Sequence, residues 1–351
     1  MTNTAVTLQD DMKAATIRAG GSKTIYAFVM PETKAAFNAV LDRDRDGLHD
    51  MYGEAWTSKQ DPMHREFFET WLNWSAPVVR MAPSALPFTY PSAGASEVLR
   101  ESINAYGHRA RAENFQPRIH VFDGEYEGYE AYAKAGNIPV IVHKRSEWEA
   151  MIKTLRPQDQ IYLSQPSALD GNIWEDYDAF MQVLEQKNPK AQVILDLTYV
   201  GAVARPYNIR ADYSNIEAVV FSLSKPMGVY YHRIGGMFSR REMPGLYGNA
   251  WFKNLLSLKL GTELMKNHTV HELPKKYQAM QVEAAKQVGK NLGLDLKLSD
   301  VWLLATATPK TNNATEKFLL RGNNDESKIR VCLTPMIDRL VNAEQTPGAK
   351  P

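Results

Sequence analysis

The chain has 351 residues, of which 44% are hydrophobic and 23% are charged. A single hydrophobic core stops growing near about 250–300 residues, so this length predicts two packed units rather than one. Lysine and arginine together number 41 and aspartate and glutamate 40, which gives a net charge of +1. Proteins built mainly to bind nucleic acid usually carry a basic excess, so nucleic acid is not an expected partner.

The use of cysteine and of apolar residues predicts a cytoplasmic protein. The single cysteine, Cys332, excludes an intramolecular disulfide and zinc sites built from several thiolates. The first residues include early acids and no apolar core, so a signal peptide is not expected. No apolar run approaches the about 18 residues that cross a bilayer, so we expect no membrane partner.

The first 25 residues are expected to form a mobile arm or to pack against a partner subunit. Farther along, three aspartates and a glycine copy the start of an EF-hand calcium loop: Asp42, Asp44, Asp46 and Gly47. The twelfth position of that loop needs a bidentate glutamate, and here it is Gly53. We therefore predict a solvated acidic turn between two helices. The histidines show no metal-binding spacing with a carboxylate, so no metal is expected.

Short apolar runs alternate with amphipathic stretches over roughly residues 80–245. The apolar runs predict strands at residues 118–122, 139–143, 160–164, 192–197, 217–223 and 235–239. The amphipathic stretches predict helices at residues 96–110, 126–135 and 174–186. This alternation of buried strands and helices predicts an α/β fold with a doubly wound, mostly parallel sheet.

The last third of the chain predicts a second, smaller unit. A long helix is expected at residues 249–267 and a charged helix at residues 273–292. Short strands and one helix should follow, which is typical of a small α+β domain. The predicted divisions are an N-terminal arm that contributes to the small domain (1–44), a large domain (45–270) and the small C-terminal domain (271–351).

The most informative stretch is FSLSKPMGVYYHRIGG, in which a lysine directly follows an apolar run. Lysine is poorly suited to a buried strand end without a partner, so Lys225 needs an explanation. A desolvated lysine of lowered pKa can form a Schiff base with an aldehyde. The hydroxyls of Ser222 and Ser224 and the guanidinium of Arg233 would suit a phosphate. Taken alone, the lysine would also fit a surface loop, and the arginine a surface ion pair.

Two further elements upstream have a matching chemistry. Asp196 ends the apolar run VILD, where an acid is costly unless it meets a cation such as a protonated pyridine nitrogen. Taken alone, it would also fit the cap of a following helix. Tyr199 is close enough in sequence to reach a phenolic oxygen of the same ring. In YPSAGASE, a glycine turn runs into a helix whose first amides, at Ala95 and Ser96, would bind a phosphate.

Together, these motifs resemble the fold-type-I pyridoxal-phosphate enzymes of the aminotransferase class I and II branch. The spacings are most similar to those of histidinol-phosphate aminotransferases and threonine-phosphate decarboxylases. The resemblance covers roughly residues 45–340, and its strongest part is the combination of DLTY, SLSK and the arginine eight residues after the lysine. It implies the cofactor pyridoxal 5'-phosphate and an α-amino acid as substrate.

The resemblance also implies a role for each matching residue. Lys225 would form the Schiff base with the cofactor and then move protons at the substrate Cα, by way of a quinonoid. Asp196 would keep the pyridine nitrogen protonated, and Tyr199 would bind the phenolic oxygen. The implied phosphate-binding residues are Ala95, Ser96, Ser222 and Arg233, with Ser224 as a weaker match.

Three more positions match residues of that family. Tyr126 would stack on the cofactor ring, although Tyr126, Tyr129 and Tyr132 also have the helical spacing of a core-packing stripe. Arg330 would bind the substrate α-carboxylate, although it would also fit an ordinary strand edge. Tyr52 would reach the phosphate of a neighbouring subunit. That last match implies a homodimer with its active site at the subunit interface.

One segment departs from the family pattern. The family usually has Asn-Pro-x-Asn-Pro-x-Gly, with its second asparagine on the phenolic oxygen. Here the sequence is QPSALDG, which puts Ala168 at that place and Asn172 four residues along. Aminotransfer is the expected reaction, and this departure favours a decarboxylase, lyase or cyclase of a specialised amino acid as the alternative. A non-catalytic pyridoxal-phosphate-binding regulator is a remote third interpretation.

Overall fold

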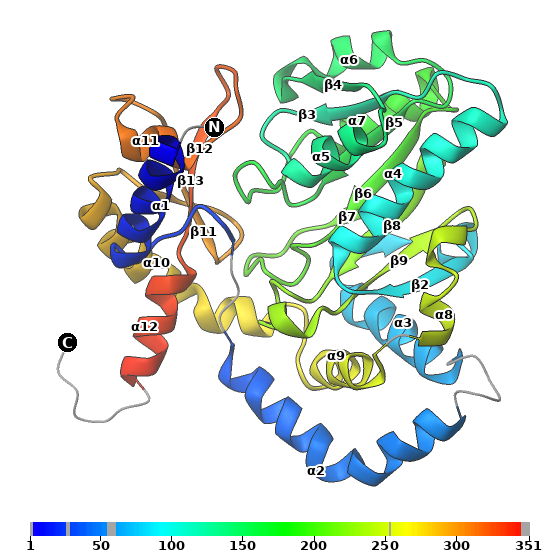
Figure 1. The fold of residues 1–351 in the computed structure, drawn as a ribbon, viewed down its shortest axis with the longest axis horizontal. Helices are drawn as coiled ribbons and strands as arrows, with labels where there is room; N and C mark the ends of the chain where they lie inside the picture. The colour runs from blue at the N-terminus through cyan, green and yellow to red at the C-terminus, as the bar shows by residue number, and fades with distance from the viewer. Residues whose placement is uncertain (1–2, 26–28, 55–60, 253, 345–351) are drawn as a thin grey trace.

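The computed structural model describes residues 3–25, 29–54, 61–252 and 254–344. Figure 1 shows a large part built around a sheet, with a smaller part beside it. The seven-stranded sheet has the order β2-β9-β8-β6-β5-β3-β4 and is mostly parallel, so the predicted α/β fold class is confirmed. Its strands are β2 (Phe88–Ser92), β3 (Ile119–Phe122), β4 (Val140–His143), β5 (Gln160–Ser164), β6 (Gln192–Asp196), β8 (Ile216–Ser222) and β9 (Gly235–Ser239).

The direction of the strands brings the predicted chemistry to one edge of the sheet. β3, β4, β5, β6 and β8 run parallel, whereas β9 is antiparallel to its neighbours β8 and β2.

The strands predicted from apolar runs are all present. The sequence does not predict β2, because Pro91 lacks the backbone N–H that a central strand donates to its neighbour. β2 is the edge strand, where Pro91 is tolerated.

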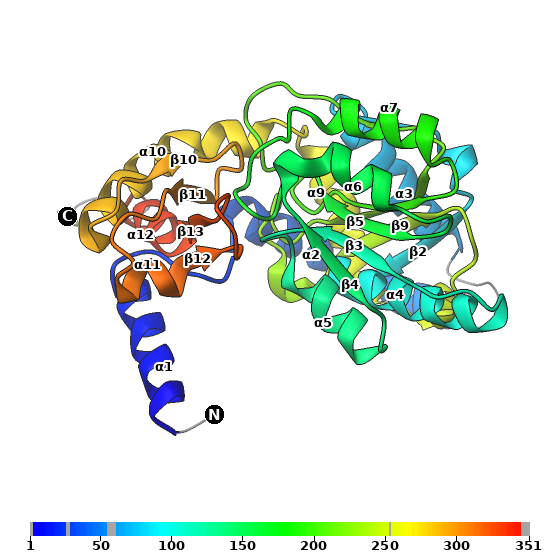
Figure 2. The same cartoon turned by 90° about the horizontal axis from the view of Figure 1, so that it is seen from above.

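Helices cover both faces of this sheet. Successive side chains of each strand point to opposite sides, so a strand made of apolar residues presents an apolar surface on both faces. In β8, Val219 and Phe221 belong to the core on the side of α3 and α9, whereas Ala218 and Val220 belong to the core on the side of α4 and α5 (Figure 2). The helices of this part are α2 (Pro31–Glu54), α3 (Asp61–Ser75), α4 (Ala95–Ala112), α5 (Glu127–Ala135), α6 (Trp148–Thr154), α7 (Tyr177–Lys187), α8 (Asn249–Phe252) and α9 (Leu255–Asn267).

Two predictions about helices are wrong. The acidic stretch that resembles a calcium loop is no turn, because α2 continues through it to Glu54. Packing of α2 on α9 and an ion pair between Arg43 and Glu263 offset the cost of Gly47 within a helix. The helix expected at 249–267 is divided into α8 and α9, since Asn254 caps α9 by accepting a hydrogen bond from the Ser257 amide at 3.1 Å.

The smaller part combines helices with an antiparallel sheet of order β10-β11-β13-β12. The N-terminal segment adds to it, because Ser22 pairs with Cys332 at the end of β13. The elements are α10 (Glu272–Leu292), β10 (Lys297–Leu298), β11 (Leu304–Ala307), α11 (Ala314–Leu319), β12 (Leu320–Arg321), β13 (Lys328–Cys332) and α12 (Thr334–Glu344). The domain boundaries given above stay a prediction.

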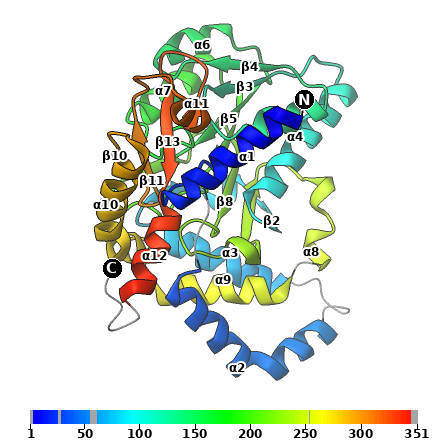
Figure 3. The same ribbon diagram turned by 60° about the vertical axis from the view of Figure 1, so that its left-hand side comes forward.

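The predicted N-terminal arm contains a helix, α1 (Asn3–Arg18), and its packing against a partner subunit stays a prediction. α1 crosses in front of the central strands in Figure 3, and Gln9 lines the cavity described below. Among the described residues, no helix is both long and apolar enough to cross a membrane. The short remaining elements are β1 (Val79–Met81) paired with β7 (Ile209–Ala211), and the 3-10 turns Pro83–Ala85, Arg145–Glu147, Tyr230–His232 and Pro244–Leu246.

Candidate active site

One cavity of about 560 Å³ gathers the predicted site residues at the carboxyl ends of the parallel strands. Tyr52 is the exception: it lies in α2, and its side chain is outside the described part of the chain. The structure therefore leaves the intersubunit role of Tyr52 as a prediction. The predicted residues that line the cavity are Ala95, Ser96, Tyr126, Asp196, Tyr199, Ser222, Ser224, Lys225, Arg233 and Arg330.

Lys225 lies in the turn just after β8, which ends at Ser222, and its side chain lines the cavity. Its Nζ donates a hydrogen bond of 2.6 Å to the carbonyl oxygen of Ile25 and lies 5.1 Å from the ring centroid of Tyr230. Burial lowers the pKa of Lys225 to about 8, with Arg233 and Arg330 acting in the same direction. A larger share of this amine is therefore neutral and nucleophilic near neutral pH than for an exposed lysine.

The rate at which Lys225 captures an aldehyde should rise with pH and reach half of its plateau near pH 8. The neutral amine is the reacting form, and raising the pH removes its proton. Acetaldehyde with borohydride trapping, followed by mass spectrometry of the modified peptide, measures this rate across pH 6–11. A half-plateau near 10.5, the ordinary lysine value, would contradict the prediction.

Asp196 is a buried carboxylate at the end of β6, with 5% of its surface exposed. Its Oδ2 accepts a hydrogen bond of 2.9 Å from the hydroxyl of Tyr129, and its Oδ1 accepts bonds from the amide and hydroxyl of Thr198. No lysine or arginine among the described residues forms an ion pair with it. Burial raises the pKa of Asp196, so a cation in the cavity would stabilise its charged form.

Two residues beside Asp196 add to what the sequence predicts. The helical spacing of Tyr129 predicts core packing, and its side chain is fully buried, but its hydroxyl also donates a hydrogen bond to the Asp196 carboxylate. Thr198 holds the other oxygen from the turn after β6. Tyr199 is 6% exposed and lines the cavity, and burial raises the pKa of its hydroxyl. Its protonated hydroxyl is therefore available as a hydrogen-bond donor.

The amino end of α4 and Arg233 form one corner of the cavity. Gly94 precedes α4 with a φ of 80°, and an added Cβ there would lie 2.7 Å from Nη2 of Arg233. That guanidinium donates to the carbonyl oxygen of Ala93 at 2.8 Å and to Oγ of Ser96 at 3.2 Å. The backbone amides at the start of α4 and the arginine held beside them together have the chemistry to bind a phosphate.

Two serines complete this corner from the strand that carries Lys225. Ser222 ends β8, and its hydroxyl donates a hydrogen bond of 3.1 Å to Oγ of Ser224. Both serines are buried and line the cavity. The two hydroxyls therefore lie next to each other, and because Ser222 donates to Ser224, the hydroxyl proton of Ser224 can be donated to an anion.

Tyr126 stands at the entrance to α5 and is not a core residue, since 36% of its surface is exposed. Its ring makes an edge contact with Tyr129 at 5.4 Å, and its hydroxyl lies 3.3 Å from that of Tyr132. The interpretation of a purely core-packing stripe therefore does not hold for Tyr126. Its ring remains available to a ligand in the cavity.

Arg330 enters the cavity from the smaller part of the molecule, on β13. It is 6% exposed, and one Nη donates to the carbonyl oxygen of Ala168. Within the described part of the chain, its buried Nε has no hydrogen-bond partner. A buried donor without a partner is costly, so a carboxylate that reaches this guanidinium would be stabilised.

Sequence reasoning missed two further cations of the cavity, Lys23 and Arg321. Burial lowers the pKa of Lys23, and the charges of Arg321 and Arg330 add to this effect. Arg321 forms an ion pair with Glu127 and donates to the carbonyl oxygen of Glu125 at 2.7 Å. No local pattern marks these residues, because they reach the cavity only when both chain ends pack together.

Comparison with known proteins agrees with this architecture. No protein-family model and no curated protein sequence matches the chain. Among solved structures, the histidinol-phosphate aminotransferase of Clostridium acetobutylicum aligns with a TM-score of 0.62 at 15% identity, over 91% of this chain and 96% of that chain. The chain has the fold of the type-I aminotransferases.

Other solved structures of this type-I fold are equally similar. The histidinol-phosphate aminotransferase of Sinorhizobium meliloti, in complex with pyridoxal-5'-phosphate, aligns with a TM-score of 0.62 at 12% identity, over 90% of this chain and 86% of that chain. The pyridoxal-phosphate-bound C-S lyase of Staphylococcus hominis aligns with a TM-score of 0.65 at 11% identity, over 93% of each chain. The type-I fold implied by the sequence motifs is therefore confirmed, and it is shared by enzymes of more than one reaction type.

Proposed function

We propose that this chain is a pyridoxal-phosphate-dependent enzyme that acts on an α-amino acid, with aminotransfer as its reaction. One observation carries the proposal. A lysine of lowered pKa, a buried carboxylate that forms no ion pair within the described residues, and a helix amino end beside an arginine line a single cavity: Lys225, Asp196 and the start of α4 with Arg233. A protonated pyridine that carries an aldehyde and a phosphate matches all three.

The residues of the cavity fit that cofactor group by group. Asp196 would hold the protonated pyridine nitrogen, which supplies the cation that its buried charge lacks. Tyr199 would donate to the phenolic oxygen, and Tyr126 would lie against the ring. When bound, the cofactor supplies an electron sink for the bonds to the substrate Cα. The phosphate would be held by Ala95, Ser96, Ser222, Ser224 and Arg233.

Lys225 and Arg330 would act on the substrate itself. The ε-amine of Lys225 would hold the cofactor covalently and, once released by the substrate amine, take the proton from Cα and return it. Arg330 would bind the α-carboxylate, since its guanidinium is buried and keeps an Nε donor without a partner among the described residues. These two contacts would fix which bond of Cα is presented to the cofactor.

The segment around Ala168 supports a second candidate, a decarboxylase, lyase or cyclase that uses the same cofactor. Ala168 lines the cavity with a methyl group where the family asparagine would offer an amide. Asn172 does not replace it, because its side-chain oxygen accepts a hydrogen bond of 2.9 Å from the amide of Asp300. Losing that donor to the phenolic oxygen would change how the cofactor distributes electrons.

The reaction type can be tested without knowing a second substrate. The holoprotein should convert to its pyridoxamine-phosphate form in stoichiometric amount when it is incubated with a panel of amino acids and no keto acid. Absorbance and mass spectrometry of the released cofactor measure this conversion. Multiple turnovers that release carbon dioxide, ammonia or a cyclised product would instead establish the second candidate. A protein that takes up no pyridoxal phosphate would contradict both.

We further propose a cytoplasmic homodimer. The match of Tyr52 to a tyrosine that reaches the neighbouring subunit supports the dimer, and the single cysteine supports a reducing compartment. Light scattering coupled to size-exclusion chromatography should give about twice the chain mass of 39.6 kDa. A mass equal to that of one chain would exclude the dimer.

A further inference from the structure

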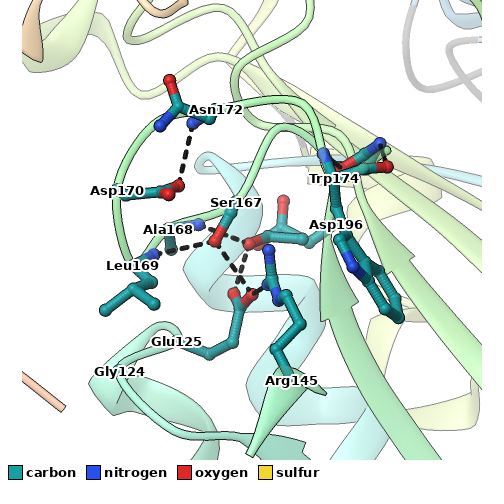
Figure 4. Close-up of polar contacts among 12 residues, drawn as sticks. Gly124, Glu125, Arg145, Ser167, Ala168, Leu169, Asp170, Asn172, Trp174 and Asp196 are labelled. Atoms are coloured by element: carbon teal, nitrogen blue, oxygen red, sulfur yellow. Dashed lines mark hydrogen bonds and ion pairs between the residues drawn. The ribbon is translucent and has the colours of Figure 1, made fainter. Parts of the chain in front are cut away.

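A buried ion pair lies behind the segment that carries Ala168. Glu125 is 5% exposed and forms an ion pair with Arg145, which follows β4 (Figure 4). The guanidinium of Arg145 lies 5.0 Å from the ring centroid of Trp174 and 5.6 Å from that of Phe122. Burying two charges costs desolvation energy that their attraction often fails to recover. Fold stability alone is therefore a weak reason for this pair.

The carboxylate of Glu125 fixes two serines of the neighbouring segment. Ser164, the last residue of β5, donates its hydroxyl proton to Glu125, and its Oγ accepts a hydrogen bond of 2.7 Å from the amide of Ala168. Ser167 donates to Glu125 at 3.4 Å and accepts from the amide of Leu169 at 3.1 Å (Figure 4). One buried charge thus orients two consecutive backbone amides.

The same segment contacts the proposed carboxylate-binding residue. The carbonyl oxygen of Ala168 accepts a hydrogen bond from Arg330, whose buried side chain also lines the cavity. The methyl side chain of Ala168 cannot accept a hydrogen bond, so the backbone carbonyl is the acceptor that this residue offers to Arg330. A continuous series of contacts therefore runs from Glu125 through Ser164 and Ala168 to Arg330.

We propose that Glu125, held by Arg145, is a positioning residue that orients Arg330 toward the carboxylate of the substrate. The inference rests on the proposed function, because it assigns a substrate carboxylate to Arg330. It goes further by naming the residues that hold this arginine in place. Ser164 is the step through which Glu125 acts, since its hydroxyl touches both the carboxylate and the Ala168 amide.

Two small probes separate this role from a general loss of structure. Aminooxyacetate and methoxyamine both react with a cofactor held on lysine, but aminooxyacetate alone carries a carboxylate. The ratio of their second-order rate constants with the holoprotein therefore reports recognition of the carboxylate. In the wild type this ratio should favour aminooxyacetate, and Arg330→Met should lower it by about tenfold, the loss of roughly one charge-assisted hydrogen bond.

Ser164→Ala and Glu125→Gln should also lower the ratio by about tenfold, with the methoxyamine rate kept within about twofold. Ser164→Ala keeps the ion pair intact, so it tests the role even where Glu125→Gln folds poorly. Glu217→Gln is the matched control. Glu217 is another buried glutamate paired with an arginine, Arg241, but it lies at the opposite end of β8 from Lys225. This control should leave both rates unchanged.

The cofactor-free protein gives an independent readout. In the NMR spectrum, the Nε–H signal of Arg330 is identified by its absence in Arg330→Met. This signal should be sharp in the wild type, where the guanidinium is held in one position, and broadened in Ser164→Ala, where it is not. An unchanged ratio in Ser164→Ala and Glu125→Gln, or an equal fall of both rates, would overturn the inference. An unchanged ratio in Arg330→Met would remove the carboxylate role itself. A wild-type protein that binds no pyridoxal phosphate would show that the proposed function, rather than the positioning role alone, is wrong.

Discussion

Replacing Lys225 with alanine should abolish covalent attachment of pyridoxal phosphate and lower the turnover of amino acids by about 1,000-fold. The variant lacks both the amine that holds the cofactor and the base at the substrate Cα. Borohydride reduction followed by mass spectrometry should find the cofactor on Lys225 in the wild type and on no residue in the variant. The absorbance band of the bound cofactor near the visible edge should disappear in parallel.

Lys23→Ala is the matched control for this experiment. Lys23 also lines the cavity, and burial also lowers its pKa. It belongs to the N-terminal segment, however, and does not follow β8 as Lys225 does. The control should keep the reducible linkage and the absorbance band. A cofactor that stays covalently attached in Lys225→Ala, or that moves to Lys23 in the wild type, would refute the assignment of Lys225.

Asp196→Asn should separate stability from function. Its carboxylate is buried without a cationic partner among the described residues, and burial raises its pKa. A raised folded-state pKa means that the charged form costs stability above the ordinary aspartate range. The amide can keep the hydrogen bonds to Thr198 and Tyr129, so the cofactor-free variant should melt at the wild-type temperature or above it.

The same substitution should weaken the cofactor-dependent reaction by about 100-fold, because a charge-assisted hydrogen bond worth about 1.5–3 kcal/mol is lost from the pyridine nitrogen. Calorimetry of the cofactor-free protein and steady-state rates of the holoprotein measure the two effects. Glu217→Gln, which also removes a buried carboxylate, should leave the rate unchanged. A lower melting temperature together with an unchanged rate would assign Asp196 a purely structural role.

The sequence predicts the centre of the candidate site well because its signals are local. Asp196 ends β6 and Lys225 comes shortly after β8, and these parallel strands bring their carboxyl ends to one edge, whereas the start of α4 is marked by the glycine turn before it. Hydrophobic runs place the strands, and a polar residue directly after such a run reaches that edge. Spacing along the chain therefore carries the spatial arrangement of these three elements.

Contacts between distant segments are less accessible to sequence reasoning. Asp42, Asp44 and Asp46 look like a loop, yet packing of α2 on α9 keeps the stretch helical. The pair of Glu125 and Arg145 joins two loops that follow different strands, and neither residue stands in a recognisable motif. Charge pairs of this kind arise from the three-dimensional neighbourhood, which local periodicity does not encode.

The length of the chain and its alternation of apolar runs and amphipathic stretches predict a large sheet-containing part and a smaller part. The predicted strand ends determine where Lys225 and Asp196 lie. The tertiary structure alone decides that Lys23 and Arg321 share the cavity with them, because Ser22 pairs with Cys332 and brings both chain ends to β13. Backbone pairing between residues that are far apart in sequence has no signature in either segment, so it requires the folded molecule to be seen.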